Sequence, residues 1–346
     1  MSQEKDHDHG LTSCHLPQNH LPHDHLTQSL CPHCLKKISA TRVQKGDSVY
    51  LVKECPEHGP MQTLIWQGEP SMSNWVRNKT KAGPKLHATQ TEKGCPFDCG
   101  ICPQHRQKTC TALIEITHRC NLNCPVCFAD SKENPADLFS GDSQNDPQTH
   151  MKDPSLEEIK GWYKRIKEIT GGQCNIQISG GEPTVRDDLP EIVRMGKEMG
   201  FGFIQLNTNG LLLAYDEALL PRLKQAGLSS VFLQFDGVDD RVHLELRGKK
   251  LQSVKERAID ICQAENIGVV LVPTLVPGVN DSQVGEIIRF GIRRSPQVRG
   301  VHFQPISYFG RFPNPREEKP RITLPHVIQH IQAQTGIDGA HFRPPG

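Results

Sequence analysis

The stretch THRCNLNCPVCF, residues 117–128, decides the fold and the chemistry predicted for this chain. It follows directly on an apolar run of strand length, Ala112–Ile116, and it brings the thiols of Cys120, Cys124 and Cys127 into one short loop. A structural zinc site is normally closed by four ligands, and an electron-transfer cluster usually has four cysteines. Three cysteines therefore favour an iron–sulfur cluster in which one iron stays open to another ligand, with a degenerate zinc site as the alternative.

From Thr111 onward, apolar runs of strand length alternate with amphipathic helical patterns, which predicts βα units around a parallel sheet. The helix predicted over Leu156–Ile169 opens with a capping box, Ser155 and Glu158. The predicted strands are Ala112–Ile116, Asn175–Ser179, Phe203–Asn207, Ser230–Phe235, Val269–Thr274 and Val301–Gln304. Further helices are predicted near 188–199, 215–226, 252–265, 282–293 and 324–334. The fold class is thus α/β, a partial (βα)6 TIM-like barrel whose chemistry gathers at the C-terminal ends of the strands.

Polar turns follow three of these strands. The second strand runs into SGGEPT, residues 179–184, where glycines permit close backbone approach to a ligand and a glutamate offers its carboxylate. The third ends in NTNG, residues 207–210, and the fourth in QFDG, residues 234–237. The candidate cofactor-binding residues are Gly180, Gly181, Glu182, Thr208, Asn209, Gln234, Asp236 and Arg247. A surface turn or a salt-bridged arginine would explain any one of the candidates after Glu182 taken alone. The prediction therefore depends on finding these residues together.

The CxxxCxxC loop, the GGE motif and the polar strand ends together resemble the radical S-adenosylmethionine (SAM) superfamily over about residues 111–305. Many members have an aromatic residue just before the third cysteine, where this chain has Val126, with Phe128 just after the cysteine. The resemblance implies a [4Fe–4S] cluster on the three cysteines whose open iron chelates the amino and carboxylate groups of SAM. It also implies reductive cleavage of SAM to a 5′-deoxyadenosyl radical, which takes hydrogen from an organic substrate. No general base can be named.

The same resemblance implies roles for single residues. Glu182 would accept from the methionine ammonium, the Asn209 turn would hold the cofactor, Asp236 would reach the ribose hydroxyls, and Arg247 would face the cofactor carboxylate.

A second CxxxCxxC motif lies upstream of the barrel. Cys95, Cys99, Cys102 and Cys110 are enough to ligate an auxiliary [4Fe–4S] cluster completely, with His105 as a substitute ligand. A zinc site at these cysteines, or an exchange of roles between the two motifs, remains open.

A third set of metal ligands lies near the N-terminus. Cys31, Cys34, Cys55 and His58 form a CxxC…CxxH pattern that flanks a predicted hairpin, as in a zinc ribbon or a rubredoxin-like knuckle. The segment has few apolar residues, so the metal, Zn²⁺ or alternatively iron, would supply much of its folding free energy. Cys174 and Cys262 lie in apolar patterns and are predicted to be packing residues.

These patterns divide the chain into four parts: a disordered His-rich tail (1–30), a metal-knuckle module (31–70), a linker with the auxiliary Fe–S segment (71–110) and the radical SAM core (111–346). With 40 basic and 39 acidic residues, the chain shows no electrostatic footprint for nucleic acid. No apolar run is long enough to span a bilayer and no signal peptide is recognisable, which predicts a cytoplasmic protein.

The order of cysteine motifs from Cys31 to Asp130 resembles the branch that contains tetraether lipid synthase and the pterin-methylating radical SAM enzymes. That branch implies C–C bond formation or carbon transfer, although the substrate does not follow from it. The predicted partners are a small-molecule or lipid-like substrate and an electron donor such as flavodoxin or ferredoxin.

Longer members of the branch continue beyond the point where this chain stops, residues 342–346. We hypothesise that the reading frame closes at a UGA codon for selenocysteine, as in the related radical SAM selenoproteins. Any other stop codon in the gene would refute this.

Two other classes of function remain open. The first is a non-catalytic sensor of metal or redox state, which would not need Glu182 or the polar strand ends. The second is an electron-transfer protein, which would be expected to ligate every cluster fully. Binding of SAM separates the enzyme from both.

Overall fold

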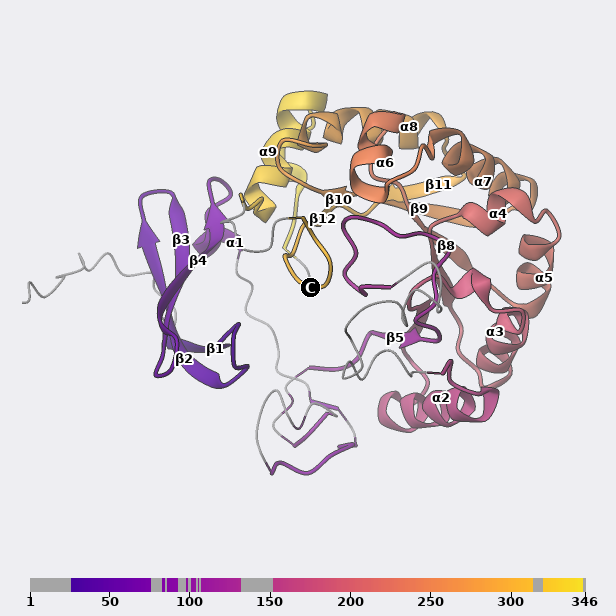
Figure 1. Ribbon diagram of the computed structural model, residues 1–346, viewed down its shortest axis with the longest axis horizontal. Helices are drawn as coiled ribbons and strands as arrows, with labels where there is room; N and C mark the ends of the chain where they lie inside the picture. The colour runs from indigo at the N-terminus through magenta and orange to yellow at the C-terminus, as the bar shows by residue number, and fades with distance from the viewer. Residues whose placement is uncertain are drawn as a thin grey trace, which may run out of the picture.

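A parallel sheet of six strands forms the centre of the computed structural model, in the order β11-β9-β8-β7-β6-β5. The structure describes residues 26–75, 83–84, 86–92, 98, 101–103, 105, 107–131, 152–313 and 320–344. The strands are β5 (Thr111–Glu115), β6 (Asn175–Ser179), β7 (Ile204–Thr208), β8 (Ser230–Gln234), β9 (Gly268–Val272) and β11 (Val298–Val301). The sheet curves into an open arc with helices along its outer side (Figure 1). The predicted partial barrel is confirmed.

The helices follow the strands in βα order. They are α2 (Leu156–Thr170), α3 (Leu189–Glu198), α4 (Leu211–Tyr215), α5 (Leu219–Ala226), α6 (Asp240–Arg247), α7 (Gln252–Ala264), α8 (Val284–Arg293) and α9 (Leu324–Thr335). Short 3₁₀ turns lie at η3 (Pro183–Val185), η4 (Asp281–Gln283) and η5 (Gly339–His341). The predicted capping box at the start of α2 is present, with both of its hydrogen bonds.

Alternation along the strands separates the core from the barrel interior. In β6 and β7, Ile176, Ile178 and Leu206 face the helices and are fully buried. Gln177 and Gln205 point the other way, and their amides meet at 3.1 Å. The hydrophobic core therefore lies between the sheet and the helices, and the inward faces of β6 and β7 present these polar amides.

Some boundaries differ from the predicted ones. The last sheet strand is Val298–Val301, not Val301–Gln304, because the register shifts at a bulge beside Gly300. The following residues, Gln304–Pro305 (β12), pair instead with Thr274–Leu275 (β10). Helix α6 was not predicted, because charged residues dominate its eight positions; Asp239 caps it by accepting from the Val242 amide.

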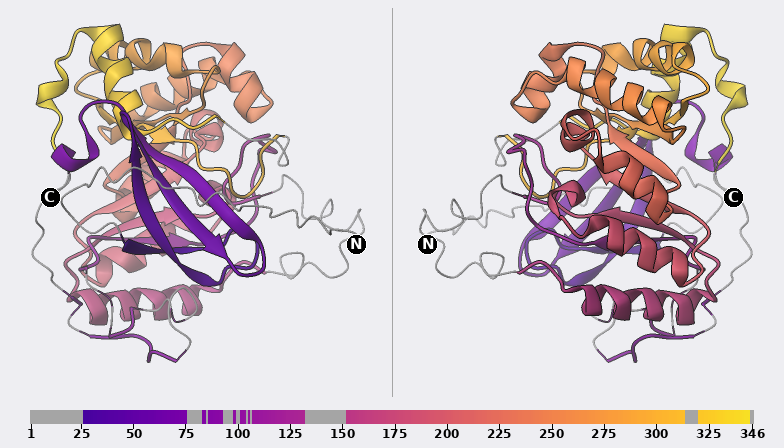
Figure 2. Two further views of the ribbon diagram at one scale, coloured as in Figure 1. Left: turned by 90° about the vertical axis from the view of Figure 1, so that its left-hand side faces the viewer. Right: turned by 90° about the vertical axis from the view of Figure 1, so that its right-hand side faces the viewer.

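The N-terminal module is an antiparallel meander of four strands instead of the single predicted hairpin. Its strands are β1 (Leu26–Leu30), β2 (Lys37–Lys45), β3 (Ser48–Cys55) and β4 (Gly59–Gln67), and Figure 2, left, looks onto the face of this sheet. Strand β1 lies within the stretch predicted as tail. The rest of that tail is outside the described residues. Beyond β4 a short helix, α1, spans Met72–Trp75.

The module contacts the barrel through one end of β4. Gln329 of α9 donates to the Glu69 carbonyl at 3.5 Å, and a Cβ at Gly68 would lie 2.4 Å from the Gln329 amide nitrogen. Across the described ranges, no helix combines the length and the hydropathy that crossing a membrane requires.

Candidate active site and metal centres

A cavity of about 390 Å³ opens at the C-terminal ends of strands β5 to β9. Its walls include the predicted cluster ligands Cys120, Cys124 and Cys127. They also include seven of the eight predicted cofactor-binding residues, namely Gly180, Gly181, Glu182, Thr208, Asn209, Gln234 and Arg247. The fold thus brings residues from four separate turns to one cavity, as the TIM-like topology predicts.

The three cysteines of the loop suit a cluster better than a single ion. Within the described ranges, one group of Cys, His, Asp and Glu side chains brings all its ligand atoms within 4.8 Å of one another, and it lies in the N-terminal module. The sulfurs of Cys120, Cys124 and Cys127 are more widely spread, as a group of several irons requires. Burial raises the pKa of Cys120 to about 12, so this thiol needs the positive charge of bound metal to ionise.

The GGE turn packs directly onto the cluster loop. The Gly181 amide donates to the Thr117 carbonyl and the Glu182 amide to the Arg119 carbonyl, both at 2.8 Å. Gly180 has φ +129°, and a Cβ there would lie 2.2 Å from the Thr117 carbonyl oxygen. At Gly181 a Cβ would lie 2.3 Å from the Arg119 carbonyl oxygen. The glycines therefore serve contact between two loops, in addition to the approach to a ligand that the sequence suggested.

Glu182 links the ends of strands β6 and β7. One carboxylate oxygen accepts from the hydroxyls of Thr184 (2.6 Å) and Thr208 (2.8 Å) and from the Thr184 amide (3.1 Å). The other accepts from the Asn209 amide at 2.7 Å, which leaves it a lone pair for a ligand ammonium. Burial raises the pKa of Glu182, although these four donors oppose the shift. The Asn209 side chain donates in turn to Asn121 in the cluster loop at 2.7 Å.

Asp236 lies behind the cavity wall. It is fully buried, does not line the cavity, and binds the Arg247 guanidinium in a bidentate pair at 2.6 and 2.7 Å. Arg247 also donates to the Val126 carbonyl of the cluster loop at 2.8 Å and to the Thr274 hydroxyl at 3.2 Å. In this structure Asp236 holds Arg247 in position instead of facing the cavity, where the predicted ribose contact would need it.

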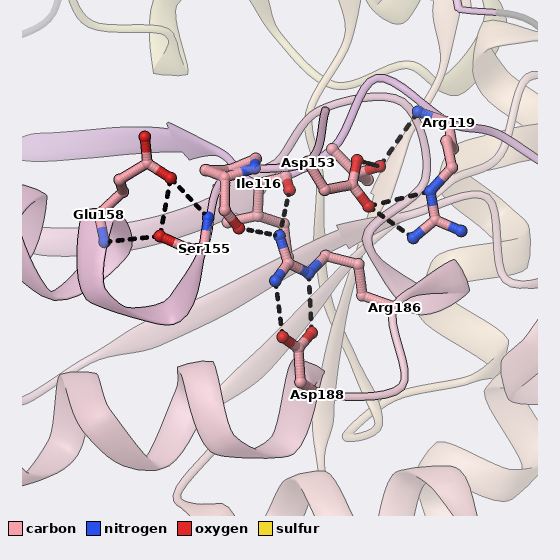
Figure 3. Close-up of polar contacts among 9 residues, drawn as sticks. Ile116, Arg119, Asp153, Ser155, Glu158, Arg186 and Asp188 are labelled. Atoms are coloured by element: carbon pink, nitrogen blue, oxygen red, sulfur yellow. Dashed lines mark hydrogen bonds and ion pairs between the residues drawn. The ribbon is translucent and has the colours of Figure 1, made fainter. Parts of the chain in front are cut away.

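Two ion pairs anchor the entry to the cluster loop (Figure 3). Arg119 binds Asp153 through Nε (2.9 Å) and a terminal nitrogen (2.5 Å). Arg186 binds Asp188 at 2.6 and 2.8 Å and donates to the Ile116 carbonyl at 2.8 Å. The backbone that leads from β5 into the cysteine motif is therefore held by charged groups from β6–α3 and from the start of α2.

Sequence reasoning missed Arg311, which fastens the other end of the cluster loop. Its backbone makes two 2.8 Å hydrogen bonds with Cys127. Its side chain donates to the carbonyls of Cys124 (2.8 Å) and Ser131 (2.6 Å) and to the Asp130 carboxylate (3.1 Å). No local pattern marks this arginine, because it lies 187 residues after Cys124.

Residues beside Arg311 add to the same contact. Phe309 stacks on Phe128 with ring centroids 5.0 Å apart. Gly310 has φ +66°, and a Cβ there would lie 2.5 Å from the Cys127 carbonyl oxygen. We call residues 307–313 the cluster-loop strap.

Lys255 is the second functional candidate that the sequence did not reveal. Its ammonium is fully buried and donates to the Asn209 carbonyl at 2.5 Å. Burial lowers its pKa to about 8, even though Asp236 opposes the shift. On α7 it shares a buried face with Val254 and Ala258, so its pattern is that of an ordinary core position.

The N-terminal ligands have the spacing of a mononuclear tetrahedral site. Cys34 and Cys55 Sγ lie 3.8 Å apart, and His58 Nδ1 lies 3.6 Å from Cys31 Sγ and 3.5 Å from Cys55 Sγ. Zn–S bonds of about 2.3 Å and Zn–N bonds of about 2.0 Å at tetrahedral angles give about 3.8 Å between sulfurs and about 3.5 Å between sulfur and nitrogen. His33 stacks on the His58 ring at 5.0 Å.

The remaining cysteines divide into two groups. Cys174 and Cys262 are buried in the hydrophobic core, as predicted. Of the predicted auxiliary-cluster ligands, Cys102 is buried and Cys110 is exposed, while Cys95 and Cys99 lie outside the described residues. The auxiliary cluster stays a prediction.

Two family models match this chain: the Radical SAM superfamily over residues 114–291 and the HMPTM N-terminal zinc ribbon domain over residues 24–67. The chain belongs to the radical SAM superfamily and is an enzyme of that class, with a cluster-and-SAM core and an N-terminal Cys3His zinc site. These findings confirm the superfamily and the zinc ribbon inferred from the motifs.

Particular relatives narrow the branch. The chain is 40% identical over 310 residues to 7,8-dihydro-6-hydroxymethylpterin dimethyltransferase of Methanocaldococcus jannaschii, covering 89% of this chain and 58% of that protein. It is 31% identical over 202 residues to GTP 3′,8-cyclase of Listeria monocytogenes, covering 57% of this chain and 55% of that protein. Among solved structures, methylornithine synthase (PylB) aligns with a TM-score of 0.48 and 16% identity, over 66% of this chain and 64% of that chain. The chain thus spans little more than half the length of these two curated relatives.

Proposed function

We propose that this chain forms the radical SAM and zinc-ribbon part of an enzyme that transfers carbon to a pterin. The observation that carries the proposal is the 40% identity over 310 residues to a pterin dimethyltransferase, a match that covers 89% of this chain. Cluster and SAM, when bound, supply a 5′-deoxyadenosyl radical that removes a hydrogen atom from an organic molecule.

The chain's own residues position these groups. Arg119, Arg247 and Arg311 donate to the cluster loop or to its anchors. Glu182 lines the cavity, and the oxygen that accepts only from the Asn209 amide has a lone pair for the SAM ammonium. The proposed cofactor contacts are those of Glu182, Asn209 and Arg247, with Asp236 supporting Arg247 from behind.

The cavity chemistry favours a polar heterocycle over a lipid, the other substrate class suggested by the branch. Glu115 and Asn207 line the cavity, and the buried Asn207 Oδ1 has no hydrogen-bond partner among the described residues. A hydrocarbon chain packed there would offer these two acceptors no hydrogen bonds. A pterin offers several ring nitrogens, an amino group and a carbonyl.

The test is an anaerobic assay of the reconstituted protein with SAM and with dithionite, or with reduced flavodoxin or ferredoxin as donor. We expect 5′-deoxyadenosine, formed faster with 7,8-dihydro-6-hydroxymethylpterin, and a pterin that gains methyl groups from further SAM, which leaves as S-adenosylhomocysteine. The Cys120→Ala, Cys124→Ala, Cys127→Ala variant should form neither product, whereas Cys174→Ala, which removes a core thiol, should behave like wild type.

The outcomes separate two levels of the proposal. A protein with full iron and sulfide that forms no 5′-deoxyadenosine would contradict radical chemistry by this chain. Formation of 5′-deoxyadenosine that no pterin stimulates, with every pterin recovered unchanged, would contradict the substrate class alone.

A further inference from the structure

Four inward-facing side chains form one row across the barrel, near the C-terminal ends of strands β5 to β8. They are Glu115, Ser179, Asn207 and Phe232, and all four line the cavity. Glu115 is the register partner of Ser179, and Asn207 is the register partner of Phe232. The Asn207 amide joins the two pairs by donating to the Ser179 hydroxyl at 3.2 Å.

Two acceptors in this row lack partners among the described residues. Glu115 is exposed to the cavity, and within the described ranges its carboxylate makes no hydrogen bond or ion pair. Asn207 Oδ1 is buried and has no hydrogen-bond partner there either. A buried acceptor without a donor destabilises a protein, so it is expected to meet a donor when the cavity fills.

The row matches the chemistry of a flat heterocycle with an amino-pyrimidinone edge. Such an edge presents two parallel N–H groups, from a ring nitrogen and the adjacent amino group, and a carboxylate accepts both as it does from arginine. The neighbouring aromatic ring, Phe232, is held by contact with His302 at 5.3 Å and offers a face for stacking. Asn207 Oδ1 is available for one further ligand donor.

We propose that Glu115 binds the amino-pyrimidinone edge of the substrate, with the ring against Phe232 and Asn207 accepting from another ring donor. The inference rests on the proposed function, since it assumes a pterin in this cavity. It goes beyond that function by naming the residue that selects the ring, and the edge by which the ring is held.

The experiment measures binding, without turnover, by anaerobic equilibrium dialysis of the cluster-loaded protein in the presence of SAM. The probes are pterin and lumazine, which carries a carbonyl oxygen where pterin has its amino group. We expect wild type to bind pterin more tightly than lumazine. Glu115→Gln should weaken pterin binding about tenfold or more, since hydrogen bonds to a charged acceptor are stronger than those to a neutral amide.

The control variant is Glu198→Gln, at the exposed C-terminal end of α3, which should leave both affinities unchanged. Iron content and thermal stability of Glu115→Gln should equal those of wild type, since its carboxylate has no partner in the described part of the chain. The preference for pterin over lumazine should shrink in this variant, and lumazine binding should change little.

Other results would overturn the inference. Two results for Glu115→Gln would show that Glu115 does not bind the amino-pyrimidinone edge: an unchanged preference for pterin, or an equal drop in affinity for pterin and lumazine. The proposal of a pterin substrate would stand in either case. Failure of wild type to bind either ring would instead remove the proposed function and the inference with it.

Discussion

At the scale of single residues, the buried pair of Asp236 and Arg247 is the most sensitive part of the site. Burial alone would raise the pKa of Asp236, but the adjacent guanidinium outweighs burial and holds that pKa below its usual value. Removing one partner would leave an uncompensated charge where the side chains are almost fully enclosed.

Asp236→Asn is expected to lower the free energy of unfolding by about 3–5 kcal/mol, because the Arg247 charge would remain buried without its partner. Urea unfolding at neutral pH measures this. The matched control is Glu245→Gln in the exposed pair Arg241–Glu245, which should change the free energy by about 0.5 kcal/mol or less. A similar small effect for both variants would contradict the role given to the buried pair.

The same pair predicts the sign of an acid effect. Since the folded pKa of Asp236 lies below its unfolded value, its contribution is fully present above the unfolded pKa of about 3.9. It is lost as the pH falls through the lower, folded pKa. The difference between wild type and Asp236→Asn should therefore shrink only in strong acid.

Lys255 predicts an effect of the same sign at high pH, because the folded pKa of this side chain is lowered too. Between its folded pKa of about 8 and the ordinary value of 10.5, the unfolded chain binds a proton that the folded chain has released. Stability therefore rises with pH across this window, by up to about 3 kcal/mol. In urea unfolding, the free energy of unfolding of wild type should rise relative to that of Lys255→Met between pH 8 and 10.5. The difference between wild type and the exposed Lys250→Met should stay constant over the same range. A constant difference in the free energy of unfolding between wild type and Lys255→Met across this pH range would contradict the lowered pKa of Lys255.

At the scale of elements, the cluster loop is held between two segments that are distant in sequence. The GGE turn supports it from β6, and the strap at 307–313 supports it from the C-terminal part of the chain. A loop that binds a cluster through three cysteines depends on such outer contacts to orient its ligands.

Arg311→Gln should loosen this loop, because it removes the charged donor that reaches Cys124, Asp130 and Ser131. We expect the iron and sulfide content to fall several-fold faster under an anaerobic chelator, with a changed EPR signal on adding SAM. Arg222→Gln, in an exposed pair with Asp216, is the control and should retain its cluster. Equal retention in both variants would show that the strap does not position the loop.

At the scale of the whole molecule, the zinc ribbon and the barrel differ in what stabilises them. The barrel has a large continuous core between sheet and helices. The buried cluster of the ribbon is small and includes two of the metal ligands, Cys31 and Cys55, with Ile38; Ala40 and Val49 are the other buried apolar residues described there. We propose that these are separate domains, with the ribbon starting at Leu26, and that the metal supplies most of the ribbon's stability.

Zinc removal should therefore unfold the ribbon and leave the barrel folded. Hydrogen exchange after treatment with a strong chelator should show lost amide protection in β1 to β4 and unchanged protection in β5 to β9. Cys55→Ala should reproduce this and lose the bound zinc, measured by elemental analysis, whereas Cys174→Ala should keep it. Full protection of β2 and β3 without metal would contradict the proposal.

Local sequence patterns determined the class of this protein. The spacing of Cys120, Cys124 and Cys127, the GGE turn and the CxxC…CxxH set are short-range features, because each set of ligands or turn residues lies within one loop or on two adjacent turns. The alternation of strand and helix patterns predicted the barrel, because the spacing of apolar residues along each element shows which of its sides is buried.

Only the tertiary structure decided how these parts meet. Asp236 lies behind Arg247, Lys255 is buried under the Asn209 turn, and Arg311 reaches a loop 187 residues away. The row from Glu115 to Phe232 depends on the register of strands that are distant in sequence. Such contacts arise from packing between elements, and packing brings together residues whose separation along the chain carries no periodic or local signal.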